Sequence, residues 1–163
     1  CIQKDNLQLD AETIRAEKKK IYDKLIRDEL ELKPGALSLI NTLFGNYRLC
    51  IASSSRIESI ILCTDKFKLR SRFEKLISDT EMVKGKPHPD IFLKAAELMK
   101  AKAEECLVIE DSIAGLSAAK AAKMACIVCP DSFCDIRLSE LNEADKIVNR
   151  LDEITNDTIK SLS

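Results

Sequence analysis

Several signals that mark common protein classes are missing from this sequence of 163 residues. No apolar run approaches the roughly 20 residues that a membrane-spanning helix needs, and no secretory signal peptide is visible. The glycine-rich patterns G-x-G-x-x-G and G-x4-G-K-[ST] do not occur, which disfavours the common nucleotide-binding loops. Because 26 Lys and Arg residues nearly balance 27 Asp and Glu residues, a nucleic-acid-binding surface is also disfavoured. An anionic ligand must therefore be bound by a few individual side chains rather than by a broad basic surface.

What the sequence does contain is typical of one globular domain. Hydrophobic residues make up 45% and charged residues 33%, and the length suffices for a sizeable core. Seven cysteines, an odd number without a secretory signal, indicate reduced thiols and a cytoplasmic protein. Cys126, Cys129 and Cys134 could suggest a zinc site. However, residues 126–129 read as a buried strand whose ends point to opposite faces, so buried thiols are favoured.

The hydrophobic pattern predicts helices and strands in alternation. Residues 11–30 are expected to form an amphipathic helix, because apolar residues recur there on one face. Further helices are expected near 34–44, 57–66, 89–100 and 112–123, and strands near 47–52, 75–78, 106–109, 125–129 and 147–148. The run 106–109 is continuously apolar, which is typical of a parallel strand covered on both faces. The alternation favours a doubly wound α/β fold with a parallel sheet.

Three serines follow the first predicted strand and precede a helix: Ser53, Ser54 and Ser55. In open α/β sheets, ligands bind at the carboxyl ends of the strands. Hydroxyls and free backbone N–H groups at a helix N-terminus can hold an anion there. Serine is also a common helix N-cap, so the pattern leaves both interpretations open.

A turn stiffened by two prolines surrounds Lys86, in the segment K-P-H-P-D-I-F at 86–92. A lysine fixed in such a turn can place a positive charge on a phosphate group, although most surface lysines are simply solvated. His88 is the single histidine of the chain. We interpret it as a loop residue without an assigned role.

Two carboxylates, Glu110 and Asp111, directly follow the apolar run 106–109. Adjacent carboxylates at the end of a buried strand need a counter-charge. Mg²⁺ supplies one and is commonly bound by one or two carboxylates together with phosphate oxygens and water. The alternative is that these acids only complement the dipole of the following helix.

The three patterns occur in one order along residues 11–155, and together they resemble the haloacid dehalogenase-like hydrolases. They are a strand followed by Ser53, the motif K-P-x-P-D-x-F, and a strand followed by E-D-S-x-x-G at 110–115. The closest resemblance is to the branch of β-phosphoglucomutase and small sugar-phosphate phosphatases. It implies a Rossmann-like core at 32–163 and, at 1–31, the remnant of a helical cap.

The resemblance also implies roles for the candidate residues. Ser53 would bind the transferring phosphoryl group and Lys86 would neutralise it, so both are candidate catalytic residues. The remaining members of the predicted site would line the phosphate (Ser54, Ser55) or hold Mg²⁺ (Glu110, Asp111). The implied ligand is a small phosphorylated metabolite, with no nucleic acid or membrane partner.

One element of the family is not found in the sequence. The resemblance implies an aspartate nucleophile in a D-x-D motif on the first strand of the core, and no D-x-D occurs in the 163 residues. The chain also begins with Cys1 rather than Met. We therefore expect a fragment of a longer protein that lacks the first strand and is inactive by itself. The alternatives are a strand supplied by another chain and a degenerate, non-catalytic relative.

The implied function is that of a Mg²⁺-dependent phosphatase acting through an aspartyl-phosphate in the full-length protein. The substrate would be a small metabolite such as a sugar phosphate. A phosphosugar mutase and a non-catalytic binding or regulatory relative are the alternatives. Carbon–halogen hydrolysis is less favoured, because the acidic pair at 110–111 suggests a metal site. Substrate identity and oligomeric state stay open.

Overall fold

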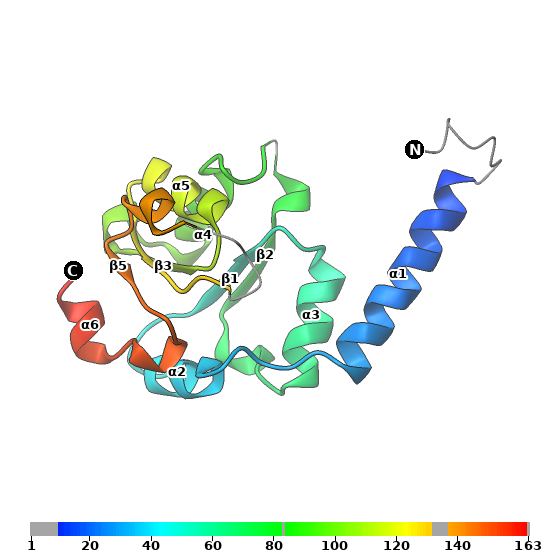
Figure 1. The fold of residues 1–163 in the computed structure, drawn as a ribbon, viewed down its shortest axis with the longest axis horizontal. Coiled ribbons are helices and arrows are strands. Elements are labelled where there is room, and N and C mark those ends of the chain that lie inside the picture. The colour runs from blue at the N-terminus through cyan, green and yellow to red at the C-terminus, as the bar shows by residue number, and fades with distance from the viewer. Residues whose placement is uncertain (1–9, 83, 132–136, 163) are drawn as a thin grey trace.

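Helices and parallel strands alternate in the computed structural model, which describes residues 10–82, 84–131 and 137–162 (Figure 1). The helices are α1 (Ala11–Asp28), α2 (Ala36–Leu43), α3 (Ile57–Lys66), α4 (Asp90–Met99), α5 (Ile113–Ala121) and α6 (Asn156–Lys160). The strands are β1 (Cys50–Ser53), β2 (Lys75–Ser78), β3 (Leu107–Glu110), β4 (Ala125–Val128) and β5 (Lys146–Ile147). The predicted α/β class with parallel strands is confirmed.

The strands form two parallel sheets, one of β1 and β2 and one of β3, β4 and β5 in that order. Lys86 contacts both β1 and β3, through the Ala52 carbonyl and the Glu110 carboxylate. Within the described ranges each of these two strands pairs with another strand on one edge only. The prediction that 106–109 is covered on both faces holds only for Val108, because Leu107 and Ile109 stay half-buried beside the unpaired edge.

Helices cover both faces of the sheets, as a doubly wound fold requires. On one face α4 and α5 bring Ile91, Phe92 and Leu116 into a buried cluster. On the other face α2 and α6 contribute Leu39 and Ile159 to a second cluster.

The thiols of Cys126, in β4, and of Cys129, just after it, lie in these two cores. Cys126 packs in the first cluster and Cys129 in the second, so the predicted opposite orientation is confirmed. Cys134 lies outside the described residues. Among the residues that are described, no three His, Cys, Asp or Glu side chains gather in a metal-binding group, and Cys126 and Cys129 are free thiols.

The Cys126 thiol predicts a measurable loss of stability at high pH. Burial, and secondarily the charge of Glu110, raise the pKa of this thiol from 9.0 to about 12. Because the folded-state pKa is the raised one, the stabilisation is complete below pH 9 and is lost as the pH rises from 9 to 12. We expect the free energy of unfolding to fall less steeply over this window in Cys126→Ala than in the wild type. Urea unfolding at a series of pH values checks this, and equal slopes would contradict it.

Helix α1 leaves the body of the domain and packs against α3 (Figure 1). Asp10 caps it by accepting hydrogen bonds from the backbone N–H groups of Glu12 and Thr13. The predicted apolar face has the right period, yet only Ile26 at its end is buried. Ile21 is 62% exposed, because α3 reaches only the last turns of the helix. The two helices are also joined by Lys66, whose ammonium donates to the carbonyl of Ile26 at 2.8 Å.

Gly35 is the turn residue on which the entry into α2 depends. Its φ is +85°, and a Cβ there would lie 2.5 Å from the backbone nitrogen of Asp152. Gly45 has nearly the same φ, +87°, but open space around it. We expect Gly45→Ala to cost about 1 kcal/mol for the left-handed conformation. Gly35→Ala should cost a further ~2 kcal/mol for the steric conflict. Urea denaturation measures both, and equal losses would contradict the close packing against Asp152.

Two elements differ from the sequence prediction. The first strand begins at Cys50 rather than 47, and helix α6 (Asn156–Lys160) was not predicted. Asn46 and Tyr47 instead donate backbone hydrogen bonds to the carbonyl of Leu43, which close the turn after α2. Over the described part of the chain, every helix is too short or too polar to cross a membrane.

Candidate functional site

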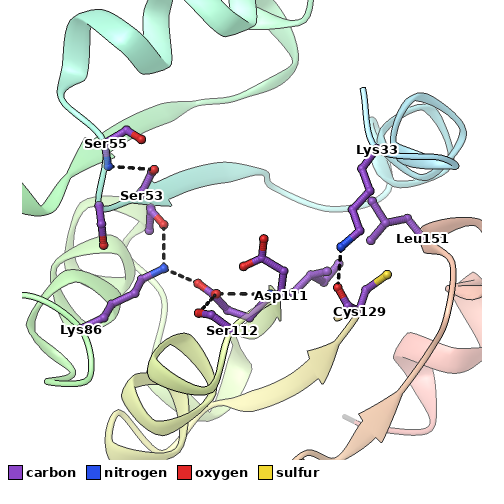
Figure 2. Close-up of a pocket in the computed structure, with 12 residues that line it drawn as sticks. Lys33, Ser53, Ser55, Lys86, Asp111, Ser112, Cys129 and Leu151 are labelled. Carbon is purple, nitrogen blue, oxygen red and sulfur yellow. Dashed lines mark hydrogen bonds and ion pairs between the residues drawn. The ribbon is translucent and has the colours of Figure 1, made fainter. Parts of the chain in front are cut away.

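The predicted site residues meet in one cavity of about 460 Å³ at the carboxyl ends of β1, β3 and β4 (Figure 2). Every residue that the sequence singled out for the site lines it: Ser53, Ser54, Ser55, Lys86, Glu110 and Asp111. Ser53 and Glu110 are the last residues of β1 and β3, and the others come from the segments that follow β1, β2 and β3. The sheet edge therefore brings together a hydroxyl cluster, an ammonium and two carboxylates. His88 is exposed and does not line this cavity.

The serine loop after β1 is held in place by its own hydrogen bonds. The Ser53 hydroxyl accepts a hydrogen bond from the backbone N–H of Ser55 at 3.1 Å. Helix α3 starts after Arg56, whose side chain makes no capping bond. The serines thus do not cap α3, and the N-cap interpretation that the sequence left open is wrong.

Ser78, which lies outside the predicted site, also holds the serine loop in place. Ser78, at the end of β2, is 1% exposed, and its hydroxyl donates to the carbonyl of Ser55 at 2.7 Å. Ser53 is paired with Ser78 in the register of β1 and β2. Sequence reasoning missed Ser78 because a single serine at a strand end carries no distinguishing pattern.

Lys86 and Glu110 form an ion pair at the wall of the cavity. Their side chains are only 12% and 9% exposed. The Lys86 ammonium also lies 3.4 Å from the carbonyl of Ala52 and 4.9 Å from the centre of the Phe92 ring. Lys86 therefore bridges the unpaired edges of β1 and β3, and a positive charge is fixed beside the serine loop.

The Glu110 carboxylate is held from several sides. One oxygen binds Lys86, and the other accepts from the Ser112 hydroxyl at 3.2 Å and from the backbone N–H of Asp111 at 3.4 Å. Ser112 also caps α5 by accepting from the N–H of Gly115. A Cβ on Gly115 would lie 2.0 Å from the second Glu110 oxygen, so the glycine of E-D-S-x-x-G makes room for this carboxylate.

Asp111 differs from Glu110 in its surroundings. Its carboxylate is exposed at the cavity and points into it between the serine loop and Lys33 (Figure 2). Mg²⁺ is commonly held by one or two carboxylates together with phosphate oxygens and water. Asp111, with Glu110 beside it, matches that donor set for an ion shared with a bound phosphate.

The structure adds Lys33 to the cavity, a residue between the predicted helices at 11–30 and 34–44 that the sequence analysis did not single out. Its ammonium donates to the carbonyl of Cys129, just beyond β4, at 2.7 Å, and it faces Asp111 from the side opposite to Lys86 (Figure 2). The contact joins residues 96 positions apart. No local pattern could reveal it, because the segment between α1 and α2 is brought to the strand end only by the packing of α2.

Comparison with known proteins shows the family of the chain. The haloacid dehalogenase-like hydrolase family matches residues 2–123. The bifunctional riboflavin kinase/FMN phosphatase of Arabidopsis thaliana is 37% identical over 131 residues, which cover 78% of this chain and 34% of that protein. The β-phosphoglucomutase of Bacillus subtilis is 39% identical over 95 residues, or 58% of this chain and 41% of the relative. The chain thus spans less than half the length of either.

A solved structure shows the same arrangement of elements. CbbY from Rhodobacter sphaeroides in complex with phosphate superposes with a TM-score of 0.80 at 26% identity, over 90% of this chain and 66% of that one. The resemblance inferred from the serine, K-P-x-P-D-x-F and E-D-S-x-x-G patterns is therefore confirmed by sequence and by fold. The chain belongs to the haloacid dehalogenase-like hydrolases, on the side of the family that includes β-phosphoglucomutase.

Proposed function

We propose that the protein of which this chain is a part is a Mg²⁺-dependent phosphatase of small phosphorylated metabolites. One observation carries the proposal: Ser53, Lys86 and Asp111 line a single cavity at one edge of the sheets. A hydroxyl, an ammonium and a free carboxylate are the groups that a phosphate and a divalent cation need together. Relatives named as phosphatases of FMN and of pseudouridine 5'-phosphate support the substrate class.

Each residue has a defined task in this proposal. The Ser53 hydroxyl and the serine loop would donate hydrogen bonds to the phosphoryl oxygens. Lys86 offsets the negative charge that these oxygens carry in the transition state. Glu110 keeps Lys86 in position, and Asp111 would hold Mg²⁺ with Glu110 assisting. A bound Mg²⁺ would supply further electrostatic stabilisation of the phosphoryl group.

We propose further that the nucleophile comes from a segment outside these 163 residues. The family resemblance implies a D-x-D aspartate, and the sequence contains none. The facing edges of β1 and β3 have unsatisfied strand pairing in the part of the fold that is described. Since parallel strands satisfy their backbone groups by pairing, a strand between them would deliver its carboxyl end to the cavity. The chain alone would then bind phosphate without hydrolysing it.

Two further proposals concern the domains and the compartment. By the family resemblance, residues 1–31 would be the end of a helical cap, to which the exposed face of α1 belongs, and 32–163 the core. The free thiols at Cys50, Cys63, Cys106, Cys126 and Cys129 agree with a reducing compartment such as the cytoplasm.

Two measurements test the proposed function. Isothermal titration of the chain with inorganic phosphate should show binding in the presence of Mg²⁺ and a loss of binding with EDTA. The protein extended by its upstream coding sequence should hydrolyse members of a panel of phosphate esters, again only with the metal. Turnover that persists in EDTA would overturn the proposal. Formation of an isomeric sugar phosphate instead of free phosphate would identify a mutase, and absence of any turnover in the extended protein would identify a binding or regulatory relative.

A further inference from the structure

Lys33 is a cavity residue whose ammonium forms no ion pair with the carboxylates that the structure describes. It is half-buried, and its ammonium makes one hydrogen bond, to the Cys129 carbonyl. The ion pairs formed among the described residues do not include it. A lysine ammonium has three N–H donors, so two remain for other acceptors. A half-buried cation with spare donors at the wall of a cavity is suited to an anionic ligand.

Lys33 is held apart from the phosphate-binding groups. Lys86 spans the edges of β1 and β3 through Ala52 and Glu110, whereas Lys33 is fixed beyond the end of β4. Neighbouring strands are about 4.8 Å apart, and the two lysines lie on opposite sides of Asp111 (Figure 2). A phosphate group that contacts Ser53 and Lys86 therefore lies on the β1 side and leaves Lys33 to another group.

We propose that Lys33 binds a second anionic group of the substrate, a phosphate or a carboxylate, so that the site favours metabolites with two anionic groups. The inference rests on the proposed function, because it takes the first phosphate to bind at Ser53 and Lys86. Lys86 already has Glu110 as a counter-ion. Among the described residues, the Lys33 ammonium has only the neutral carbonyl of Cys129 as a hydrogen-bond partner, so a second anion gains more from Lys33 than from Lys86, the other cation that lines the cavity.

The chain offers a matched control for testing Lys33. Lys66 makes the same kind of contact, from its ammonium to a backbone carbonyl, that of Ile26, at 2.8 Å, and it does not line the cavity. If Lys33 only supports the fold, Lys33→Met and Lys66→Met should act alike, through stability alone. If Lys33 binds substrate, only Lys33→Met should change ligand selectivity.

The experiment is isothermal titration of the chain, with Mg²⁺, against glucose 6-phosphate, 6-phosphogluconate and fructose 1,6-bisphosphate. The wild type should bind the two doubly anionic ligands more tightly than glucose 6-phosphate. Lys33→Met should weaken their binding roughly tenfold, as expected when one charged hydrogen bond is lost, and leave glucose 6-phosphate within about twofold. Lys33→Arg should retain the preference, and Lys66→Met should bind like the wild type. Thermal unfolding confirms that each variant is folded.

The outcomes separate the two proposals. Equal affinities of the wild type for all three ligands, or an equal loss for all three in Lys33→Met, would overturn the role of Lys33 and leave the phosphate site intact. Absence of Mg²⁺-dependent binding of every ligand would overturn the proposed function and the role of Lys33 with it. A preference for one doubly anionic ligand over the other would show whether the second group is a phosphate or a carboxylate.

Discussion

Lys86→Met should abolish phosphate binding and also destabilise the chain by about 3 kcal/mol. The second effect follows from the ion pair, since both side chains are nearly buried and the substitution leaves the Glu110 carboxylate without its counter-charge. Titration calorimetry with inorganic phosphate and Mg²⁺ measures the first effect, and urea unfolding the second.

A second substitution separates the two effects of Lys86. In Lys86→Met/Glu110→Gln the unpaired charge is gone, so most of the lost stability should return while phosphate binding stays absent. Lys94→Met is the matched control, because the Lys94–Glu97 pair is exposed and should contribute less than about 0.5 kcal/mol. Recovery of phosphate binding in the double variant would show that Lys86 serves only to satisfy Glu110.

Gly115→Ala should destabilise the chain, although the same substitution in an ordinary helix usually stabilises a protein. Replacing a helical glycine by alanine usually stabilises a protein by up to about 1 kcal/mol. Here the added Cβ would lie 2.0 Å from a Glu110 oxygen and 2.7 Å from its Cγ. The Glu110 side chain must move, which breaks its bonds to Lys86 and Ser112. We expect a net loss of about 2 kcal/mol and weaker phosphate binding, measured by urea unfolding and calorimetry.

The three atoms nearest to the added Cβ all belong to Glu110, so removal of this side chain should restore the usual sign. In a Glu110→Ala background these three contacts are gone, and Gly115→Ala should then stabilise the chain by about 1 kcal/mol. A double-mutant cycle over the two positions gives the coupling directly. If Gly115→Ala destabilises equally in both backgrounds, the backbone of α5 rather than Glu110 is what excludes the side chain.

The helices and most strands could be predicted because their signals are local. The apolar runs at 106–109 and 125–129 lie within one or two residues of β3 and β4, and the proline turn before Asp90 fixes the start of α4. α6 was missed since five residues, Asn156–Lys160, are too few for a period of 3.6 to repeat. Its place is set by the burial of Thr158 and Ile159 against the core.

The site was predictable as far as strand ends could be recognised. Ser53, Lys86 and Asp111 each follow a strand, and the geometry of parallel sheets brings such positions together. Lys33 and Ser78 could not be found in this way. Their roles depend on contacts with Cys129 and Ser55, which exist only after distant segments have packed. Likewise, the sequence predicts that Glu110 binds a metal, and only the fold reveals the ion pair of Glu110 with Lys86.

Because of the way α1 is attached, it should unfold locally while the rest of the domain stays folded. Because its buried contact is confined to Ile26 and its hydrogen bond to Lys66 lies at the same end, the helix can melt from Asp10 inward without disturbing either core. Backbone amides near Thr13 should therefore exchange with solvent through local fraying, and those of β4 only when the whole domain unfolds. No residue of the first two turns of α1 lines the cavity. Fraying of these turns should therefore leave the geometry of the cavity unchanged.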